Sequence, residues 1–404
     1  MSASGAERSL RLLVLTPLGQ NGAGGIDRMW DKVRVDLQRR SGDGVSVEFL
    51  TTRGPHAGRV GTYAWGVYFF LAAFLSAAAK MALRRVDVLH VSLASGGSTV
   101  RKLHFVALAQ LFRVPYVIHL RGGGFRDYWN TRSVPMTKVI DRMFDRARGI
   151  VVLGSFWSKV VTDRRPKLAE RIVVLPNATA RCPRRSAIRD PSSPVSILYL
   201  GRLERAKGIP ELIEALSRLV QTPGWVAAIV GDGDIVEARA AVARAGLDGL
   251  VELPGWLDSD GVEERLNTAD ILVLPSFHEG LPNAVVEAFS HGLAVVTTPV
   301  GALPDIVKDE VTGLLVQPGS VDSLASALAR LIDDEPLRRR LGENARLVHY
   351  EKLNLDGYVD RLIQIWRTAA TDRGARVRPY AQRRIRTVSS IEASGASMSV
   401  DDRE

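Results

Sequence analysis

The sequence predicts an α/β protein built from two doubly wound parallel sheets, one in each half of the chain. Short β-branched runs alternate with amphipathic helical stretches, which is typical of parallel strands joined by crossover helices. The alternation occurs twice. Between the two series, residues 176–194 are rich in Pro, Arg and Ser and follow neither periodicity. A chain of 404 residues has room for two domains of roughly 150 residues or somewhat more.

The expected strands are short apolar runs bounded by turn residues. In the first half they are residues 10–15, 45–50, 86–91, 116–120, 150–153 and 172–175. In the second half they are residues 195–200, 226–230, 251–253, 271–274, 294–298 and 314–316. We expect a first domain over 1–180, a linker over 181–194 and a second domain over 195–370, whose last helix could pack back on the first. Residues 371–404 lack an apolar pattern and are expected to form a disordered tail.

The composition is that of an ordinary globular protein, with 46% hydrophobic and 24% charged residues and a mean hydropathy of +0.02. These values exclude a largely disordered chain and a protein with many membrane spans. The single cysteine, Cys182, cannot close an intrachain disulfide, and no cysteine pair is available for a structural zinc. Because no secretory signal pattern opens the chain, we expect a cytoplasmic protein.

The net charge of +10 is unevenly distributed. Residues 1–190 carry 31 basic and 13 acidic side chains, whereas the remaining residues carry 23 basic and 31 acidic ones. A basic half attracts a polyanion, which could be nucleic acid, an anionic membrane surface or a phosphorylated substrate. The alternative is the solvated surface of a protein from an Arg-rich proteome. Nucleic acid is disfavoured, because neither zinc-finger spacing nor an aromatic RNA-binding motif is present.

Residues 60–79 contain no charged residue and are long enough to span a membrane. A span here would place the expected strands 45–50 and 86–91 of one sheet on opposite sides of a bilayer, so a non-spanning helix is favoured. Aromatic side chains are concentrated in this segment, which suits a helix at a membrane interface. A buried core helix, a membrane-docking helix and a true span remain the three alternatives.

The loop after the first expected strand, residues 19–25, is rich in glycine and leads into an amphipathic helix. Gly24 and Gly25 would let the backbone approach an anion at the positive end of that helix. A dinucleotide site would also need an acidic residue after the second strand, where Thr-Thr-Arg stands at 51–53 instead. We therefore expect an anion site and disfavour bound NAD.

A second loop, residues 201–208, carries Arg202 and Lys207 ahead of a helix opened by Pro210. An Arg fork and a mobile Lys ammonium beside a helix start can bind the two phosphates of one diphosphate. The alternative is a solvated loop whose cations pair with Glu204.

The third loop contains Glu279, and Glu287 lies early in the helix that follows, with its side chain leaning back toward the helix start. The two carboxylates are expected to converge where backbone N–H groups also point. Because carboxylates repel phosphate, they suit hydroxyl groups, one of a ribose and one of a sugar. The alternative interpretation makes Glu279 a turn residue and Glu287 a helix-surface residue.

Two Asp-x-Asp strings, residues 232–234 and 258–260, are interpreted as turns rather than metal ligands, because no partner carboxylate or His is indicated near them. The cations of the second loop and a helix start already supply positive charge to a leaving group. The prediction is a site without a metal.

Three motifs together resemble the retaining glycosyltransferases of family four. They are G-R-L-x-x-x-K-G from residue 201, E-G-L-P-N-x-x-x-E-A from residue 279, and H-G-L-A-V-V-T-T-P-V-G from residue 291. The resemblance extends to about residue 370 and is strongest over 195–318. It implies two Rossmann-like domains facing each other across a cleft, the GT-B arrangement. The first would bind the acceptor and the second a nucleotide-sugar donor.

The resemblance also implies roles for single residues. Arg202 and Lys207 would bind the diphosphate of the donor. Glu287 would bind its ribose, and Glu279 a hydroxyl of its sugar. Further donor contacts would come from Gly24, Gly25, Gly280, Leu281, Pro282 and Asn283.

Two positions need separate comment. His119 ends the strand YVIHL and resembles the family's active-site histidine, the alternative being a hydrogen-bonded structural residue. Asp305 stands where Glu is usual in the family, which is a conservative departure.

The implied activity is transfer of a sugar with retained configuration by front-face attack, with no metal and no cofactor. The basic first half and the apolar segment add an expected acceptor on an anionic membrane: a polyprenyl-diphosphate-linked saccharide or a glycolipid of surface polysaccharide or glycoconjugate synthesis. The protein would then be peripheral on the inner face of the cell membrane. The alternatives are a nucleotide-sugar epimerase or phosphorylase of the same fold, a nucleic-acid-binding protein, or a catalytically silent membrane-docked scaffold.

Overall fold

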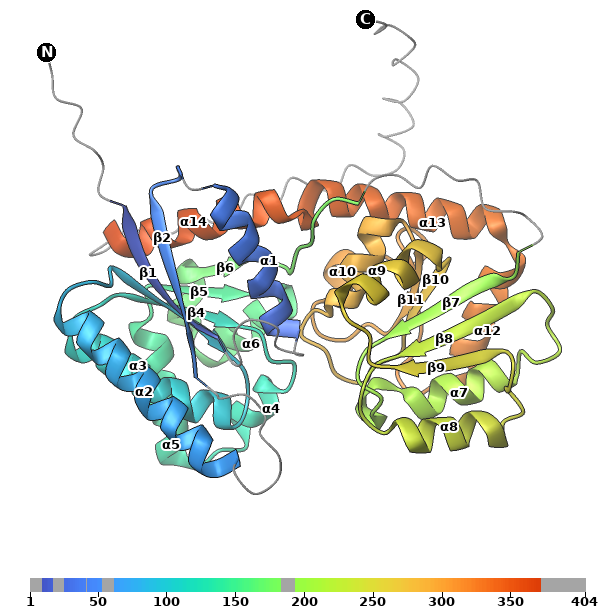
Figure 1. Cartoon of the computed structure of the whole chain (residues 1–404), viewed down its shortest axis with the longest axis horizontal. Coiled ribbons are helices and arrows are strands. Elements are labelled where there is room, and N and C mark those ends of the chain that lie inside the picture. The colour runs from blue at the N-terminus through green and yellow to red at the C-terminus, as the bar shows by residue number, and fades with distance from the viewer. Residues whose placement is uncertain (1–8, 17–24, 41, 53–61, 183–192, 372–404) are drawn as a thin grey trace, which may run out of the picture.

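Two α/β domains stand side by side and are bridged by two helices near the C-terminus, α13 (Glu335–Val348) and α14 (Leu355–Thr371) (Figure 1). The computed structural model describes residues 9–16, 25–40, 42–52, 62–182 and 193–371. Each domain contains one six-stranded parallel sheet covered by helices. The expected fold class, two doubly wound parallel-sheet domains, is confirmed.

The first sheet has the order β2-β1-β3-β4-β5-β6. Its strands are β1 (Leu10–Thr16), β2 (Val45–Thr51), β3 (Val88–Leu93), β4 (Tyr116–Leu120), β5 (Gly149–Val152) and β6 (Ile172–Val174). The helices between them are α1 (Gly25–Arg39), α2 (Thr62–Ala82), α3 (Gly97–Leu111), α4 (Phe125–Asn130), α5 (Val134–Arg146) and α6 (Ser155–Arg164), followed by the 3₁₀ turn η1 (Pro166–Arg171).

Side chains alternate along these strands, so the sheet feeds two cores. In β1, Leu13 and Leu15 face a core shared with α2 and α3, whereas Leu12 and Val14 face a second core shared with α1 and α14. The central strands β3, β4 and β5 are buried along their whole length. Burial on both faces explains why these strands occur in the sequence as continuous apolar runs.

The second sheet has the order β12-β11-β10-β7-β8-β9. Its strands are β7 (Val195–Leu200), β8 (Trp225–Val230), β9 (Val251–Gly255), β10 (Ile271–Leu274), β11 (Ala294–Thr297) and β12 (Leu314–Leu315). Before α13 its helices are η2 (Arg205–Lys207), α7 (Ile209–Ser217), α8 (Ile235–Arg244), α9 (Ser259–Thr268), α10 (Asn283–His291), α11 (Leu303–Ile306) and α12 (Val321–Asp333), and the π-helical turn η3 (His349–Leu353) separates α13 from α14.

Each expected strand has a counterpart in the structure, with shifts at the ends. The largest shift is in β3, expected from residue 86 but beginning at Val88. The cause is Asp87, whose carboxylate accepts hydrogen bonds from the backbone N–H and the guanidinium of Arg11. This ion pair joins β1 to the residue that precedes β3. The pairing of the two strands begins one residue later, where Leu12 pairs with Val88.

The strand order reverses beside the first strand of each sheet. β1 lies between β2 and β3, and β7 lies between β8 and β10. A crevice opens outside the carboxyl ends of the strands at such a switch point. Residues that follow β4 in one sheet and β7 and β8 in the other line one shared cavity, so the two crevices face each other.

Helix α14 packs on the first domain, although the chain reaches it after the second. Its side chains Tyr358, Leu362 and Trp366 share a core with Trp30 of α1 and the strands of the first sheet. The chain therefore crosses between the domains twice, once before β7 and once at η3. The two crossings touch where Thr179 forms a β-bridge with Asn354.

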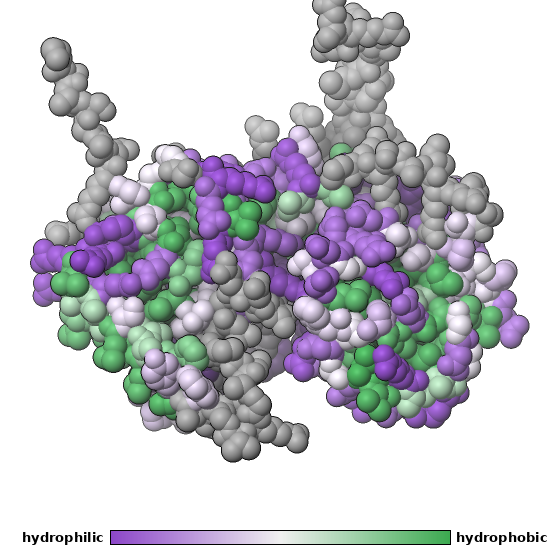
Figure 2. All heavy atoms as spheres, viewed as in Figure 1, coloured by the Kyte–Doolittle hydropathy of each residue, from purple (hydrophilic) through white to green (hydrophobic). Residues whose placement is uncertain are grey.

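Helix α2 is apolar on both its packed and its free face. Ala73, Ala77 and Met81 are buried, and Phe70 and Phe74 pack edge-on against Phe105 of α3. Large apolar side chains on the rest of the helix are exposed: Trp65, Val67, Tyr68, Leu71 and Leu75. Figure 2 shows hydrophobic residues gathered over this part of the first domain. Residues 65–82 are long and apolar enough to cross a membrane, yet only 17% of them are buried, so α2 is not a buried core helix.

Candidate functional site: a cavity between the two sheets

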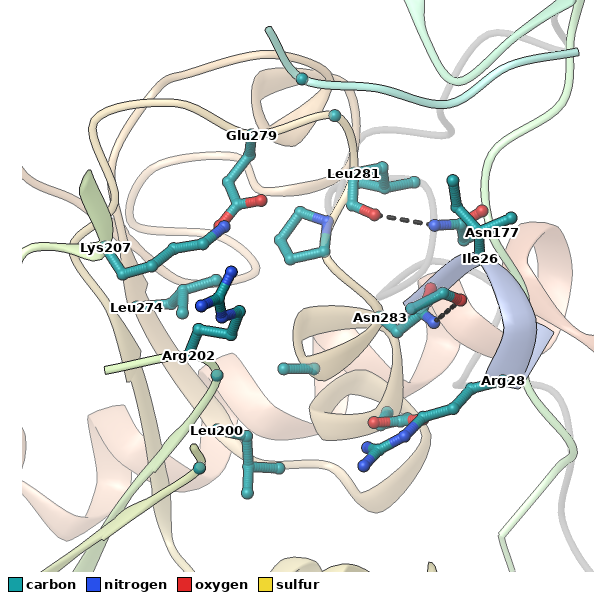
Figure 3. Close-up of a pocket in the computed structure, with 18 of the residues that line it drawn as sticks. Ile26, Arg28, Asn177, Leu200, Arg202, Lys207, Leu274, Glu279, Leu281 and Asn283 are labelled. Carbon is teal, nitrogen blue, oxygen red and sulfur yellow. Dashed lines mark hydrogen bonds and ion pairs between the residues drawn. The ribbon is translucent and has the colours of Figure 1, made fainter. Parts of the chain in front are cut away.

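A cavity of about 480 Å³ lies between the domains. Figure 3 shows Arg202 and Lys207 entering it from the second domain, opposite Ile26 and Arg28 of α1. The first domain contributes Gly25, Ile26, Arg28, Arg121, Gly123, Gly124 and Asn177. The second contributes the loops after β7, β8, β9 and β10 together with the first turns of α10.

The start of α10 is aimed into this cavity. The helix begins at Asn283, and its N-cap residue, Pro282, provides no side-chain cap to the first turn. Leu281, Pro282 and Asn283 line the cavity just ahead of it. Free N–H groups and the positive end of a helix form a ready site for an anion.

Lys207 and Glu279 form an ion pair across the second and third loops, with 2.7 Å between Nζ and Oε1. The hydroxyl of Ser276 donates to the same oxygen at 2.8 Å. Glu279 is only 9% exposed, so the cation and the hydroxyl together compensate a nearly buried carboxylate. Within the described part of the chain, Oε2 of Glu279 has no hydrogen bond, which leaves it available to a ligand hydroxyl. The charge of Glu279 and burial together raise the pKa of Tyr199 well above its usual value, with burial the larger cause.

Arg202 is the less constrained of the two cations. Its side chain is 65% exposed, and its distances to Glu204 and Asp232 are 3.7 and 3.9 Å. The expected alternative of pairing with Glu204 is therefore present only as a long contact. Because exposed ion pairs at such distances contribute little, an arriving anion can recruit the guanidinium at small cost.

Glu287 meets a cation from the opposite domain. Its Oε1 lies 2.7 Å from Nζ of Lys32 in α1, and the same ammonium donates to Thr179 at 2.8 Å. No sequence pattern predicts this pair, because Lys32 is an ordinary polar position on an amphipathic helix. The contact turns Glu287 into a link between domains as well as a wall of the cavity.

Further hydrogen bonds hold the third loop against the first domain. The amide of Asn177 donates to the carbonyl of Leu281 at 2.7 Å, and the amide of Asn283 donates to that of Gly25 at 2.9 Å. Both bonds are drawn in Figure 3. The indole of Trp157 donates to the carbonyl of Gly280 at 3.2 Å.

Glycines allow two backbone loops to touch beneath the cavity. A Cβ on Gly123 would lie 2.9 Å from the carbonyl carbon of Glu279 and from the nitrogen of Gly280. A Cβ on Gly280 would lie 2.9 Å from the carbonyl oxygen of Arg121. Since neither backbone can move aside easily, these positions need glycine for close approach rather than for an unusual φ.

A carboxylate of the second domain caps a helix of the first. Asp305 accepts hydrogen bonds from the backbone N–H and the hydroxyl of Ser155, at the start of α6. An acidic group is favourable at a helix N-terminus. Glycine at position 154 makes space for this carboxylate, since a Cβ there would lie 2.3 Å from the carboxylate of Asp305.

Most residues expected at the site from the sequence do line this one cavity. They are Gly25, Arg202, Lys207, Glu279, Gly280, Leu281, Pro282, Asn283 and Glu287. Gly24 lies outside the described residues. His119 is the exception, because it does not line the cavity.

His119 lies on the face of β4 that α14 covers, and it is completely buried. Its ring meets that of His90 edge-on at 5.3 Å, and neither ring nitrogen has a partner within the described residues. Burial, with a smaller effect from the charge of Arg121, holds the pKa of His119 well below its ordinary value. The structure thus places a buried, neutral His119 behind the residues that line the cavity.

Several lining residues were not expected from the sequence, notably Arg28, Arg121, Asn177 and Trp256. The sequence around Arg121 does contain a pattern that indicates a ligand-binding loop. Arg121 follows the strand 116–120 directly and precedes three glycines, which is the composition of a ligand loop at a sheet edge. Trp256 follows β9 and is exposed, which a sequence pattern does not show.

Potential metal ligands gather outside the cavity. Among the described residues, Cys182, Glu263 and His291 bring three ligand atoms within 4.8 Å of one another. The string at 258–260, expected to be a turn, instead begins helix α9, because the carboxylate of Asp258 caps it by accepting from the N–H of Gly261.

Comparison with known proteins identifies the second domain. A family model described as Glycosyl transferases group 1 matches residues 184–348. An uncharacterised glycosyltransferase of Methanocaldococcus jannaschii is 30% identical over 43% of this chain and 45% of its own. The glycogen synthase of Mycobacterium tuberculosis is 32% identical over 60% of each chain. A lipopolysaccharide core biosynthesis glycosyltransferase of Rhizobium meliloti is 29% identical over 45% of this chain and 52% of its own. The matches thus cover about half of each relative.

Solved structures show the fold of the whole. Sucrose-phosphate synthase from Thermosynechococcus elongatus superposes with a TM-score of 0.70, covering 89% of this chain and 98% of that one at 20% identity. Anabaena HepE in complex with UDP and glucose superposes with a TM-score of 0.66, covering 88% and 98% at 17% identity. The chain therefore has the GT-B fold, and its residues 184–348 match the family model of the glycosyl transferases group 1.

Proposed function

We propose that the protein is a retaining glycosyltransferase that moves a sugar from a nucleoside-diphosphate sugar to a hydroxyl group of a membrane-borne acceptor. The observation that carries the proposal is the cavity itself, where Arg202, Lys207 and the uncapped start of α10 surround one space beside the carboxylate of Glu279. Cations and N–H groups fit a diphosphate, and the carboxylate fits a sugar hydroxyl.

The chemistry follows from this division of charge. Breaking the bond between the anomeric carbon and phosphate places negative charge on the departing diphosphate and oxocarbenium character on the sugar. Arg202, Lys207 and the α10 amides stabilise the former, so the leaving group needs no divalent metal. Glu279 orients the sugar through its free oxygen. Front-face attack, with the departing phosphate accepting the acceptor's proton, retains the anomeric configuration without a separate base.

The rest of the donor has matching surfaces. Glu287 accepts hydrogen bonds from the ribose hydroxyls, while its contact with Lys32 joins the two domains beside the nucleotide. Leu200, Val230 and Trp256 give an apolar wall for the base. The solved HepE complexes hold UDP, glucose or UDP-glucose, and a donor of that chemical class is proposed for this chain.

The proposed acceptor is a polyprenyl-diphosphate-linked saccharide or a glycolipid used for surface polysaccharide or glycoconjugate synthesis. The name of the Rhizobium meliloti relative places that protein in lipopolysaccharide core biosynthesis. In this chain the basic half is the first domain, the one expected to bind the acceptor. A cytoplasmic protein at the inner face of the membrane would meet both substrates.

We propose that α2 docks on the membrane instead of crossing it. β2 and β3 flank β1 in one sheet, so both ends of α2 connect to the same domain. The exposed side chains Trp65, Tyr68 and Leu71 suit insertion at the lipid interface, and Arg84 and Arg85 follow the helix end, where they can meet anionic headgroups. Each such cation contributes about 1 kcal/mol near an anionic leaflet.

The direct test is a panel of UDP-sugars and GDP-sugars incubated with a lipid-linked acceptor, with mass detection of released nucleotide and of product. Transfer to the acceptor from one donor, with retained anomeric configuration by NMR and in the presence of EDTA, is the expected result. Nucleotide release without any acceptor product would favour an epimerase of the same fold. Activity only with pyridoxal phosphate would favour a phosphorylase.

A further inference from the structure

Arg121 is a nearly buried cation in the wall of the cavity. Only 7% of it is exposed, and it lies on the first domain, directly after β4. One guanidinium nitrogen, Nη2, donates to the amide oxygen of Asn177 at 2.7 Å and lies 3.4 Å from the hydroxyl of Tyr358. The group also lies over the ring of Trp30, 5.8 Å from its centroid.

Among the described residues, no counter-charge pairs with Arg121. Within the described part of the chain, no carboxylate forms an ion pair with it, and its other terminal nitrogen, Nη1, is buried with no hydrogen-bond partner. The neighbouring rings of His90 and His119 are neutral, because burial and this same guanidinium lower their pKa values. A buried charge without a partner is strongly unfavourable unless a ligand supplies the opposite charge.

Arg121 lies on a different domain from the two cations that are proposed to bind the diphosphate. Arg202 and Lys207 belong to the second domain, whereas the carbonyl oxygen of Arg121 lies against Gly280, next to Glu279. Its backbone lies beside the loop of Glu279, and its guanidinium lies with Asn177 and Tyr358 on the first-domain wall of the cavity, away from the second-domain loop that carries Arg202 and Lys207. The amide of Asn177, which fixes the guanidinium, is itself fixed by its bond to Leu281, so the group is held in place before a ligand arrives.

We propose that Arg121 is a specificity-determining residue that binds an anionic oxygen group of a substrate other than the leaving diphosphate. Nη1 supplies the free donors, and a guanidinium suits carboxylate or phosphate oxygens. The group is either the carboxylate of an acidic donor sugar or the phosphate that links the acceptor saccharide to its lipid. This inference rests on the proposed function.

The donor arm of the test compares matched nucleotide sugars by calorimetry. UDP-glucose is paired with UDP-glucuronate, and GDP-mannose with GDP-mannuronate, and each is measured against UDP or GDP alone. If the donor carries the anion, the wild type binds the acidic sugar about tenfold or more tightly than the neutral one. Arg121→Gln abolishes this preference, and Arg121→Lys keeps part of it. Arg126→Gln, on the exposed surface of α4, is the matched control and leaves the preference intact.

The acceptor arm applies if the acidic and neutral donors bind alike. It compares the KM for a short-chain polyprenyl-diphosphate saccharide with that for the same saccharide on a neutral alkyl chain. Arg121→Gln then raises the KM of the phosphorylated acceptor alone, by about tenfold or more. The thermal melting of each variant checks that it is folded.

The outcomes separate the two proposals. If Arg121→Gln changes neither preference, or weakens UDP or GDP alone as much as their sugars, Arg121 does not have this role. If the wild type binds no nucleotide at all, the proposed function is wrong and the inference is lost with it.

Discussion

Arg202 and Lys207 differ in what their removal leaves behind. Lys207→Ala strips a nearly buried carboxylate of its partner, whereas Arg202→Ala removes only loosely paired charge. If both stabilise a departing diphosphate, each variant loses transfer by about 10² or more. The measurement is initial rate with the best donor. Arg205→Ala is the control, because it lies in the same turn but outside the cavity. Near-normal rates in both variants would remove the diphosphate assignment.

The two glutamates are expected to separate binding from transfer. Glu279→Gln keeps the shape and the contacts to Ser276 and Lys207, so nucleotide affinity should persist while transfer is lost. Glu287→Ala removes the ribose acceptor, and nucleotide binding should weaken about tenfold or more. Calorimetry with UDP and GDP measures both.

A control for the second variant is available in its partner. Lys32→Met breaks the contact between domains but leaves the carboxylate of Glu287 in place. Should Lys32→Met weaken nucleotide binding as much as Glu287→Ala, the glutamate acts as a domain link and its ribose role is wrong.

The carboxylates and cations expected from the sequence motifs line one cavity, whereas His119 on β4 does not line it and stays a prediction as a catalytic residue. The motif residues 201–208 and 279–287 are local in sequence, so their approach follows from the ends of two adjacent strands. His119 and Arg121 are two positions apart, and only the tertiary packing decides which one reaches the cavity. His119 packs against His90, which in turn contacts Trp366 of α14, a helix more than 230 residues away in the chain, and that packing has no local signal.

The loop after β4 lies so close to the loop of Glu279 that adding a single methyl group at Gly123 tests the contact. Gly123→Ala would drive a Cβ into the backbone of Glu279 and Gly280, so the two domains should separate slightly and transfer should fall by about tenfold or more, with nucleotide binding by the second domain retained. Rates and calorimetry on one preparation provide the test. Gly124→Ala is the matched control, since its Cβ would meet only Ser95 Oγ at 3.7 Å, and its loss should be far smaller. Equal losses would show that the contact is not what matters.

Helix α2 gives a prediction about membranes. The wild type should cosediment with anionic liposomes more than with neutral ones, and less at high salt, because charge attraction is screened. Replacing Trp65, Tyr68, Leu71 and Leu75 by Ser should abolish binding with the fold intact, since these side chains are exposed. Val236→Ser removes an apolar side chain of the second domain that is even more exposed, and it should change nothing. A wild type that ignores both kinds of liposome and uses a soluble acceptor well would contradict membrane docking.

The positions of the strands and helices were easier to predict from the sequence than the environment that each element faces. A parallel strand buried on both faces leaves a continuous apolar run in the sequence, and β4, β7 and β10 have the expected bounds. An apolar helix has the same sequence pattern whether its surface is covered by protein core, solvent or lipid. The choice for α2 therefore depended on its neighbours in the fold, which bury one face and leave the other open.

Stability as a whole should depend on histidines kept neutral inside the fold. Burial lowers the pKa of His90 to about 3 and that of His349 to about 4. An unfolded chain takes up these protons below about pH 6.5 and the folded protein does not, so the free energy of unfolding should fall as the pH drops from about 6.5 toward 4.

Urea unfolding at several pH values measures this loss. His90→Gln should flatten the slope by up to about 1.4 kcal/mol per pH unit within that window. Trp366→Phe removes the hydrogen bond to His90 but keeps the titrating ring, so it should lower stability without flattening the slope. An unchanged slope in His90→Gln would contradict the assignment.

The return of α14 to the first domain affects the order in which the protein can be completed during its synthesis. The strands of the first sheet are made early, but the helix that covers Trp30, Val88 and Val117 leaves the ribosome only after the whole second domain. Until then, one face of the nascent first domain exposes apolar surface, which is the condition that favours aggregation and chaperone binding. The domain that begins the chain is therefore expected to finish folding last, and a chain stopped before residue 355 would keep that face open.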